Sequence, residues 1–155
     1  MDETTVRNDI FEPGDLTALV CVDKQEIQEI VTDQLASIDY KIHVGLYADD
    51  IALKLRSFSY DIVVIEENFN NYELNENPIL RESFLLPPDQ RRQQYFVLVG
   101  DSLSTNDEML AFIYSVDLVF NVSDLTNLKP VLRRGVARHR EFYTPLNETI
   151  KTVGL

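Results

Sequence analysis

The chain has 155 residues, of which 45% are hydrophobic and 26% charged, and its formal net charge is -12. A chain of this size and composition is typical of one soluble globular domain whose core is stable without disulfides or a structural metal. The acidic balance argues against direct nucleic-acid binding, because phosphate contacts need clustered lysine and arginine. The longest apolar runs have the length of strands, so no membrane contact is predicted. A single cysteine, Cys21, excludes an internal disulfide framework and suits a reducing cytoplasm.

The two ends of the chain differ from its middle. Residues 1–15 are polar, close with the loop signal Pro13-Gly14 and lack a secretory pattern, so we expect a flexible N-terminal segment or linker in a cytoplasmic protein. The domain itself is predicted over 16–143. Pro145 is expected to start one or two further helical turns, as a C-terminal helical extension over 144–155.

Five short runs of apolar residues are predicted to be strands. They cover residues 17–22, 41–46, 62–65, 95–100 and 118–120. Most of them are continuously apolar, which is typical of strands buried on both faces, whereas 41–46 alternates and reads as an edge strand.

The stretches between these strands carry helical periodicity. Helices are expected over 24–37, from about 50 to 58, over 78–86, around 108–114 and from about 125 to 143. The long stretch 69–94, which contains the third of these helices, has the weakest pattern. Five strands alternating with five helices predict an α/β fold, a three-layer α-β-α sandwich with a parallel sheet.

Several polar residues just before these helices are predicted to be N-caps. Asp23 with Glu26, and Thr105 with Glu108, have the spacing of capping boxes. The other candidate caps are Asp49 or Asp50, and Ser123 or Asp124.

Two junctions resemble the receiver domain of bacterial response regulators. The sequence ALVCVDKQEI, from position 18, is similar to the family's first strand and acidic turn. The sequence YDIVVIEEN, from position 60, is similar to its third strand, which ends on the phospho-accepting aspartate. The resemblance covers roughly 16–143 and implies a flavodoxin-like sheet of strand order 2-1-3-4-5.

The resemblance also implies five positions for phosphoryl chemistry, and four of them are changed. The family's two metal-binding acids fall on Val22 and Asp23, its acceptor aspartate on Glu66, its hydroxyl residue on Gly100 and its lysine on Asn121. Only Asp23 is retained, although Asn68 matches an asparagine that the family often has. Because the metal and the lysine neutralise charge on the transferring phosphoryl group, we expect no enzymatic activity and no aspartyl phosphorylation.

The remaining acids of this degenerate pocket allow two interpretations. Glu66 either imitates a phosphorylated aspartate, or is an acid tolerated at a solvated loop after the chemistry was lost. Asp23 and Glu66, with Glu67, are at most weak candidates for a divalent cation, and no cofactor is expected. Cys21 is expected to be a buried apolar residue, and His43 and His139 are expected on the surface.

A basic cluster near the C-terminus is the most suggestive surface feature. Arg133, Arg134, Arg138 and Arg140 crowd one predicted helix, and Phe112 and Tyr114 on the preceding helix extend the surface. In receivers this region commonly contacts partners or a second copy, so a protein partner or a homodimer is expected here. The alternative is that these cations only favour the helix dipole and solvation.

Three functions follow, in descending order of preference. The first is a non-catalytic, pseudo-receiver interaction module working through protein contacts independently of phosphorylation. The second is a small-molecule or divalent-metal sensing domain that uses the degenerate acidic pocket. The third is a receiver that still accepts a phosphoryl group there.

Overall fold

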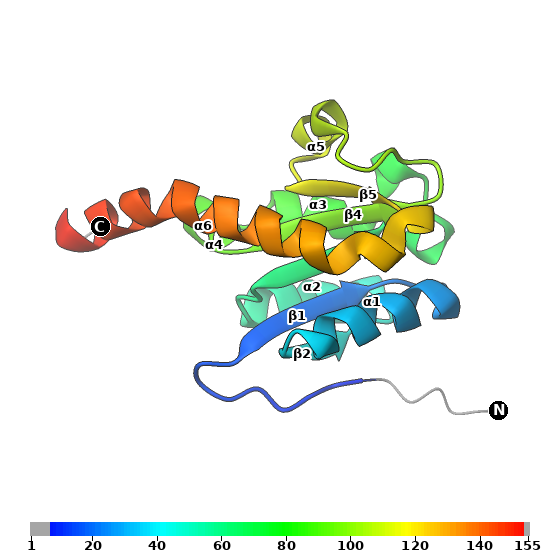
Figure 1. The fold of residues 1–155 in the computed structure, drawn as a ribbon, viewed down its shortest axis with the longest axis horizontal. Helices are drawn as coiled ribbons and strands as arrows, with labels where there is room; N and C mark the ends of the chain where they lie inside the picture. Colours follow the sequence, from blue (N-terminus) through cyan, green and yellow to red (C-terminus); the bar gives the residue numbers. More distant parts are fainter. Residues whose placement is uncertain (1–6, 154–155) are drawn as a thin grey trace.

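A five-stranded parallel sheet of order β2-β1-β3-β4-β5 lies at the centre of the structure (Figure 1). The structure is a computed structural model that describes residues 7–153. The strands are β1 (Leu16–Cys21), β2 (Tyr40–Val44), β3 (Ile62–Glu66), β4 (Tyr95–Gly100) and β5 (Leu118–Asn121). The predicted fold class and strand order are confirmed.

Helices connect the strands and cover both faces of the sheet. The α-helices are α1 (Gln25–Ser37), α2 (Ala48–Ser57), α3 (Pro78–Phe84), α4 (Pro88–Arg92), α5 (Glu108–Tyr114) and α6 (Leu128–Val153). Three short 3₁₀ helices are η1 (Phe69–Asn71), η2 (Leu74–Glu76) and η3 (Val122–Asn127). The stretch 69–94 therefore holds more helical structure than predicted, including α4, which was not predicted.

The core consists of two apolar layers, one on each face of the sheet. On one face, alternate residues of the strands pack against Val31 and Leu35 of α1 and against Leu128 and Leu132 of α6. The second layer uses the other alternate residues, which pack against α2, α3 and part of α5. Figure 1 shows α1 and α6 together in front of the sheet, with α2 and α3 behind it. The period-two alternation of a strand explains why each strand feeds both layers.

The described part of the predicted flexible segment is held against β2. The Asp9 backbone N–H donates to the Ile42 carbonyl at 2.9 Å, and the Val44 N–H donates to the Arg7 carbonyl at 2.9 Å. Asn8 also forms an antiparallel bridge with His43. Residues 7–9 therefore line the outer side of β2, while residues 1–6 lie outside the described residues.

The predicted N-caps are wrong at four helices, because the expected side chains make other contacts. The N-caps of α1 and α2 are Lys24 and Tyr47, which make no side-chain cap bond. Asp107, two positions after the predicted Thr105, accepts from the Leu110 N–H and caps α5. The Thr105 hydroxyl donates to Asp124 at 2.6 Å instead.

The last helix is longer than predicted. It begins after η3, whose own cap is Asn121, so neither Ser123 nor Asp124 caps the long helix. It then continues through Pro145 to Val153 without a break, so Pro145 does not start a separate turn. Among residues 7–153 no helix has the length and apolarity needed to cross a membrane.

Candidate functional site

The predicted pocket residues lie at the edge of the sheet where the parallel strands end. Strand register places Glu66 beside Val99 and Gly100 beside Asn121. Asp23 follows β1, which pairs with β3 on its other side. Val22 is fully buried in the layer under α1 and α6, so its side chain belongs to the core.

The Glu66 carboxylate is buried and carries its own counter-ion. Its side chain is 2% exposed, and its Oε2 lies 3.0 Å from the Lys24 Nζ. Its Oε1 accepts a hydrogen bond from the Asp23 backbone N–H at 2.7 Å. The hydrogen bond to Glu66 raises the pKa of Lys24, which keeps the ammonium charged. A lysine that precedes α1 thus neutralises the acid at the family's acceptor position.

The Asp23 carboxylate is bonded on a different side. Both of its oxygens contact the Asn70 side-chain amide, at 3.1 and 3.2 Å, and one also accepts from the Asn70 backbone N–H. Asn70 adopts a left-handed conformation with φ 53°, which asparagine tolerates. Asp23 and Glu66, the two candidate cation ligands, are therefore each engaged with a different partner. Within the described residues, no group of three or more His, Cys, Asp or Glu is arranged for a metal ion.

A second buried carboxylate, Glu67, explains the glycine at position 100. Glu67 Oε1 accepts from the Ser102 N–H at 3.0 Å, and Oε2 accepts from the Ser102 hydroxyl at 2.7 Å. A Cβ on Gly100 would lie 2.0 Å from Glu67 Oε1 and 2.4 Å from its Cδ. The family's hydroxyl position is thus filled by the Glu67 side chain, and any side chain at residue 100 would displace it.

Three asparagines lie at or near this edge of the sheet. Asn68 and Asn121 were predicted pocket residues, whereas Asn77 was not. The buried Asn77 donates from Nδ2 to the backbone carbonyls of Glu66 and Glu67, at 2.9 and 3.1 Å, while its Oδ1 caps α3. Asn121 accepts from the Ser123 N–H at 2.7 Å. Asn68 turns away from these groups, and its amide donates to the Tyr72 carbonyl at 3.2 Å.

Lys24, Ser102 and Asn77 also belong to this site, and none of them was predicted. Asn77 carried a usable signal, because an asparagine directly before a proline is typical of a helix start. Lys24 and Ser102 carried none, since their partners lie 42 and 35 residues away along the chain.

The cysteine and the histidines have structural surroundings. Cys21 is fully buried as expected, and burial raises the pKa of its thiol. The expected surface location of both histidines is wrong. His43 is half-buried, stacks on Phe11 at 4.0 Å, and bonds Tyr60 through Nδ1 at 2.8 Å. His139 packs edge-on against Tyr95, and burial lowers the pKa of both imidazoles.

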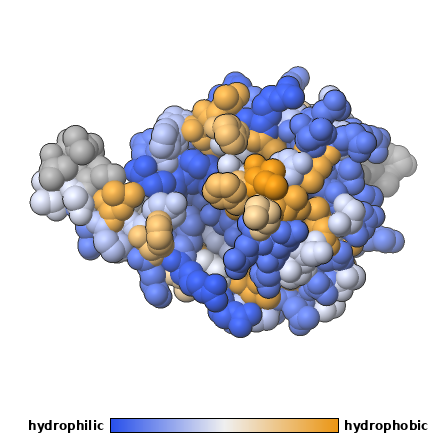
Figure 2. All heavy atoms as spheres, turned by 90° about the horizontal axis from the view of Figure 1, so that it is seen from above, coloured by the Kyte–Doolittle hydropathy of each residue, from blue (hydrophilic) through white to orange (hydrophobic). Residues whose placement is uncertain are grey.

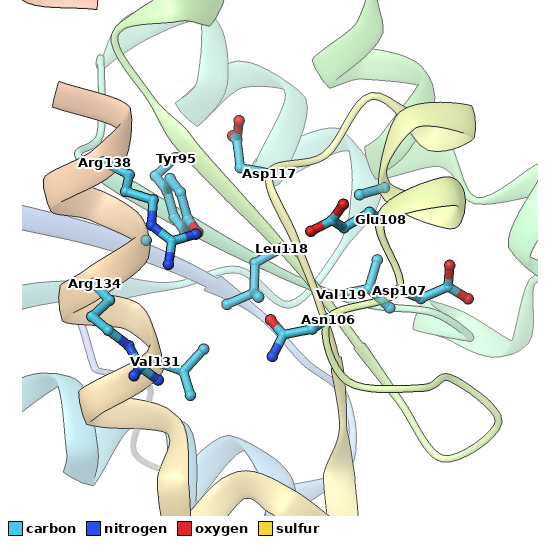
Figure 3. A pocket seen from close by; sticks show the side chains of 12 residues that line it. Tyr95, Asn106, Asp107, Glu108, Asp117, Leu118, Val119, Val131, Arg134 and Arg138 are labelled. Carbon is cyan, nitrogen blue, oxygen red and sulfur yellow. The ribbon is translucent and has the colours of Figure 1, made fainter. Parts of the chain in front are cut away.

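The predicted basic cluster divides between two sides of α6. Arg134 and Arg138 project into a groove of about 310 Å³ between α6 and the start of α5 (Figure 3). Asp107 and Glu108 lie on the opposite wall of this groove. Arg133 lines a different cavity, on the side of α6 that faces α1. The predicted grouping of Arg133 with the other two is therefore wrong.

The apolar part of the predicted surface lies on α5. Phe112 is 81% exposed, and Met109 and Ile113 beside it are 69% and 58% exposed. Figure 2 shows apolar side chains gathered on the face of the molecule that α5 occupies. Tyr114, in contrast, packs partly against the core layer below the helix, so it adds little to the exposed surface. The α5–α6 face, meaning Met109, Phe112, Ile113, Arg134 and Arg138, combines apolar and cationic side chains.

Comparisons with known proteins identify the fold. The search against protein-family models gave no match, and neither did the search of curated proteins. Among solved structures, one similar fold is the receiver domain of a sensor histidine kinase from Pseudomonas aeruginosa, with a magnesium ion coordinated in its active-site cleft. It shares 13% identity over 80% of this chain and 99% of that chain, with a TM-score of 0.61.

Two further solved structures agree. The chemotaxis response regulator CheY4 of Vibrio cholerae is 13% identical over 78% of this chain and 98% of that chain, with a TM-score of 0.59. The C-terminal part of RcsC from Escherichia coli, with its linker and phosphoreceiver domain, is 20% identical over 91% of this chain and 52% of that chain, at a TM-score of 0.59. The chain therefore has the flavodoxin-like fold of receiver domains.

Proposed function

We propose that the chain is a receiver-like signalling module that acts through protein contacts and carries out no phosphoryl transfer. The observation that carries this proposal is the buried ion pair between Lys24 and Glu66. Phosphoryl transfer in receivers, as the resemblance implies, needs an acceptor aspartate beside acids that bind Mg²⁺. Here the Lys24 ammonium supplies the positive charge beside Glu66. One of the two metal-binding acids of the family is replaced by the buried Val22.

The rest of the pocket favours an interaction module over a sensor of metals or small molecules. Each of the three carboxylates at this edge, those of Asp23, Glu66 and Glu67, already accepts hydrogen bonds from neighbouring groups. A ligand that entered would have to replace these internal bonds, and the exchange gives little net free energy. The same bonds hold Glu66 in place as a structural acid rather than as a free charge that imitates a phosphate.

We place the partner site on the α5–α6 face. Exposed aromatic and aliphatic side chains beside unpaired arginines have the composition of protein interfaces. Of the ion pairs found among residues 7–153, none uses Arg134 or Arg138. The two guanidinium groups therefore remain available to carboxylates of a protein partner or of a second copy.

Incubation with acetyl phosphate and Mg²⁺, followed by intact-mass measurement, tests the absence of phosphoryl transfer. A conventional receiver treated in parallel shows that the donor is active. We expect no phosphoryl adduct on this chain. An adduct that forms on the wild type and is lost in Glu66→Gln would overturn the proposal.

Charge reversal tests the partner site. Arg134→Glu/Arg138→Glu is expected to abolish capture of the partner, or self-association in sedimentation. The matched control, Arg133→Glu/Arg140→Glu, makes the same change in charge on the other side of α6 and is expected to leave that binding unchanged. Equal effects of both variants would show that net charge, and not this face, determines association.

A further inference from the structure

A second cavity lies on the α1–α6 side of the sheet, at the edge where the strands begin. Its volume is about 270 Å³, and it lies between the end of α1 and the middle of α6. Leu16 and Ile62, the first residues of β1 and β3, form part of its wall. The cavity is therefore separate from the acidic pocket, which lies where the same strands end.

The inner wall of this cavity is apolar. Ile62 and Leu132 are 0% and 1% exposed and belong to the core layer under α1 and α6. Val136 packs against the same layer, and the small side chain of Ala137 lines the cavity from α6. Such a wall favours an apolar body on any ligand, because the contact removes apolar surface from water.

Tyr40 supplies a hydroxyl group to this wall. Tyr40 is only 7% exposed, and its hydroxyl forms no hydrogen bond with any described residue. The hydroxyl is not a fully enclosed polar atom, so it is open to the cavity and can donate to a ligand there. Arg140 is close enough to counteract part of the rise that burial causes in the pKa of Tyr40. The hydroxyl therefore lies in the electrostatic field of a guanidinium without being bonded to it.

Two arginines line the outer part of the cavity. Arg133 and Arg140 are seven residues apart on α6, which places them two turns apart on the same side of the helix. Neither takes part in an ion pair among residues 7–153. The one acid of the lining, Asp39, is exposed and likewise unpaired with them. In a chain of net charge -12, this is a local site for an anion.

We propose that this cavity binds a small organic carboxylate with an apolar body. The carboxylate would accept hydrogen bonds from the Tyr40 hydroxyl and from the guanidinium groups of Arg133 and Arg140, whose planar fork matches its two oxygens. A cavity of roughly 150 Å³ holds a benzene ring. The volume of about 270 Å³ therefore suits a ring with a short acid side chain, of the size of 3-phenylpropionate. Such a ligand would join β2 to α6.

Binding of 3-phenylpropionate, followed by NMR titration and calorimetry on the full chain, tests this site. Arg140→Gln and Tyr40→Phe each remove one polar contact and are expected to weaken binding about tenfold. Ala137→Leu fills the cavity on an exposed helical position and is expected to abolish binding. Arg134→Gln, on the opposite side of α6, is the matched control and is expected to bind as the wild type does. Thermal unfolding of each variant shows whether it is folded.

Related compounds define the ligand class. The neutral amide 3-phenylpropionamide is expected to bind at least tenfold more weakly, and so are acetate and inorganic phosphate, which lack the apolar body. Equal binding of the amide, of acetate or of phosphate would overturn the proposal. Saturation by an acidic peptide but not by the small carboxylate would overturn it in favour of a protein contact. These results do not depend on the phosphorylation test above, because the two sites share no residue.

Discussion

Replacing Gly100 by alanine would place a methyl group in the space that the Glu67 carboxylate occupies. The added Cβ would lie 2.0 Å from Oε1, 2.4 Å from Cδ and 2.5 Å from Cγ of Glu67. Because this carboxylate is buried and its carbon atoms also clash, a small rotation cannot relieve the contact. The side chain must leave the site and lose its two donors, the backbone N–H and the hydroxyl of Ser102.

The magnitude follows from those two donors. Hydrogen bonds to a charged group contribute about 1.5–3 kcal/mol each, and water replaces part of that for a displaced carboxylate. We take about 3 kcal/mol for the pair. Replacement of a strand glycine by alanine recovers about 0.5–1 kcal/mol of backbone entropy. The net loss in the free energy of unfolding is therefore about 2 kcal/mol, which lowers the Tm by about 4–8 °C for a chain of this length.

The assay is a double-mutant cycle of Gly100→Ala and Glu67→Ala, with urea denaturation and calorimetry on all four proteins. Once the Glu67 side chain is gone, the alanine at position 100 has room, so we expect Gly100→Ala to be neutral or slightly stabilising in that background. The resulting coupling energy of about 2 kcal/mol is the quantity to compare. If Gly100→Ala costs the same with and without Glu67, the clash is not the reason for the glycine, and the reasoning is refuted.

Three further predictions concern other parts of the fold. Lys24→Met leaves the buried Glu66 carboxylate without its cation and is expected to lower the free energy of unfolding by about 1–2 kcal/mol. This value is kept small because the lysine side chain is 55% exposed to solvent. In urea denaturation, adding Glu66→Gln is expected to recover most of the loss. Gly135→Ala would gain about 1 kcal/mol of helix propensity on an open helix, yet its Cβ would lie 2.0 Å from the Tyr95 hydroxyl oxygen and 2.8 Å from the ring Cζ, so we expect a net loss. Tyr95→Phe removes the oxygen but keeps Cζ, so it is expected to reduce this loss without abolishing it. The folded-state pKa of His43 is lowered by burial, so its contribution to stability is complete above the unfolded value of about 6.5 and is lost as the pH falls through the folded value. Tm measured from pH 8 to pH 5 should fall at the acid end, with a smaller fall in His43→Phe; an unchanged fall would assign it to other groups.

The sheet could be predicted from the sequence because its signal is local. A continuously apolar run such as 62–65 has no stable position except between two layers, and the alternation of strand and helix then fixes the parallel arrangement. The short helix α4 could not be predicted, because none of its five residues is buried. A helix without a buried face shows no periodic pattern of apolar residues in the sequence. The N-cap predictions were wrong for a related reason. Several polar residues lie within two positions of each helix start, and tertiary contacts decide which of them caps the helix.

The candidate site could be predicted in position but not in chemistry. Strand register alone brings Asp23, Glu66 and Gly100 to one edge of the sheet, and the resemblance named those positions. Which donor meets which carboxylate depends on the direction of each side chain, and the direction is set only by packing. Gly100 shows the difference most clearly, because the resemblance implies only a lost hydroxyl there, whereas in the structure the neighbouring Glu67 side chain occupies the space beside it.

The contacts at the two outer strands affect how this protein can associate with others. Residues 7–9 bond to β2 along its outer side, and on β5 the Asn106 N–H donates to the Val119 carbonyl while the Thr105 hydroxyl oxygen accepts from the Asn121 N–H. An exposed strand edge is a template for strand addition, which leads to aggregation or to indiscriminate pairing between chains. Because both edges already carry backbone or side-chain partners, pairing through main-chain ladders is blocked there. The partner contacts proposed above would then depend on side chains presented by helices, which can discriminate one partner from another.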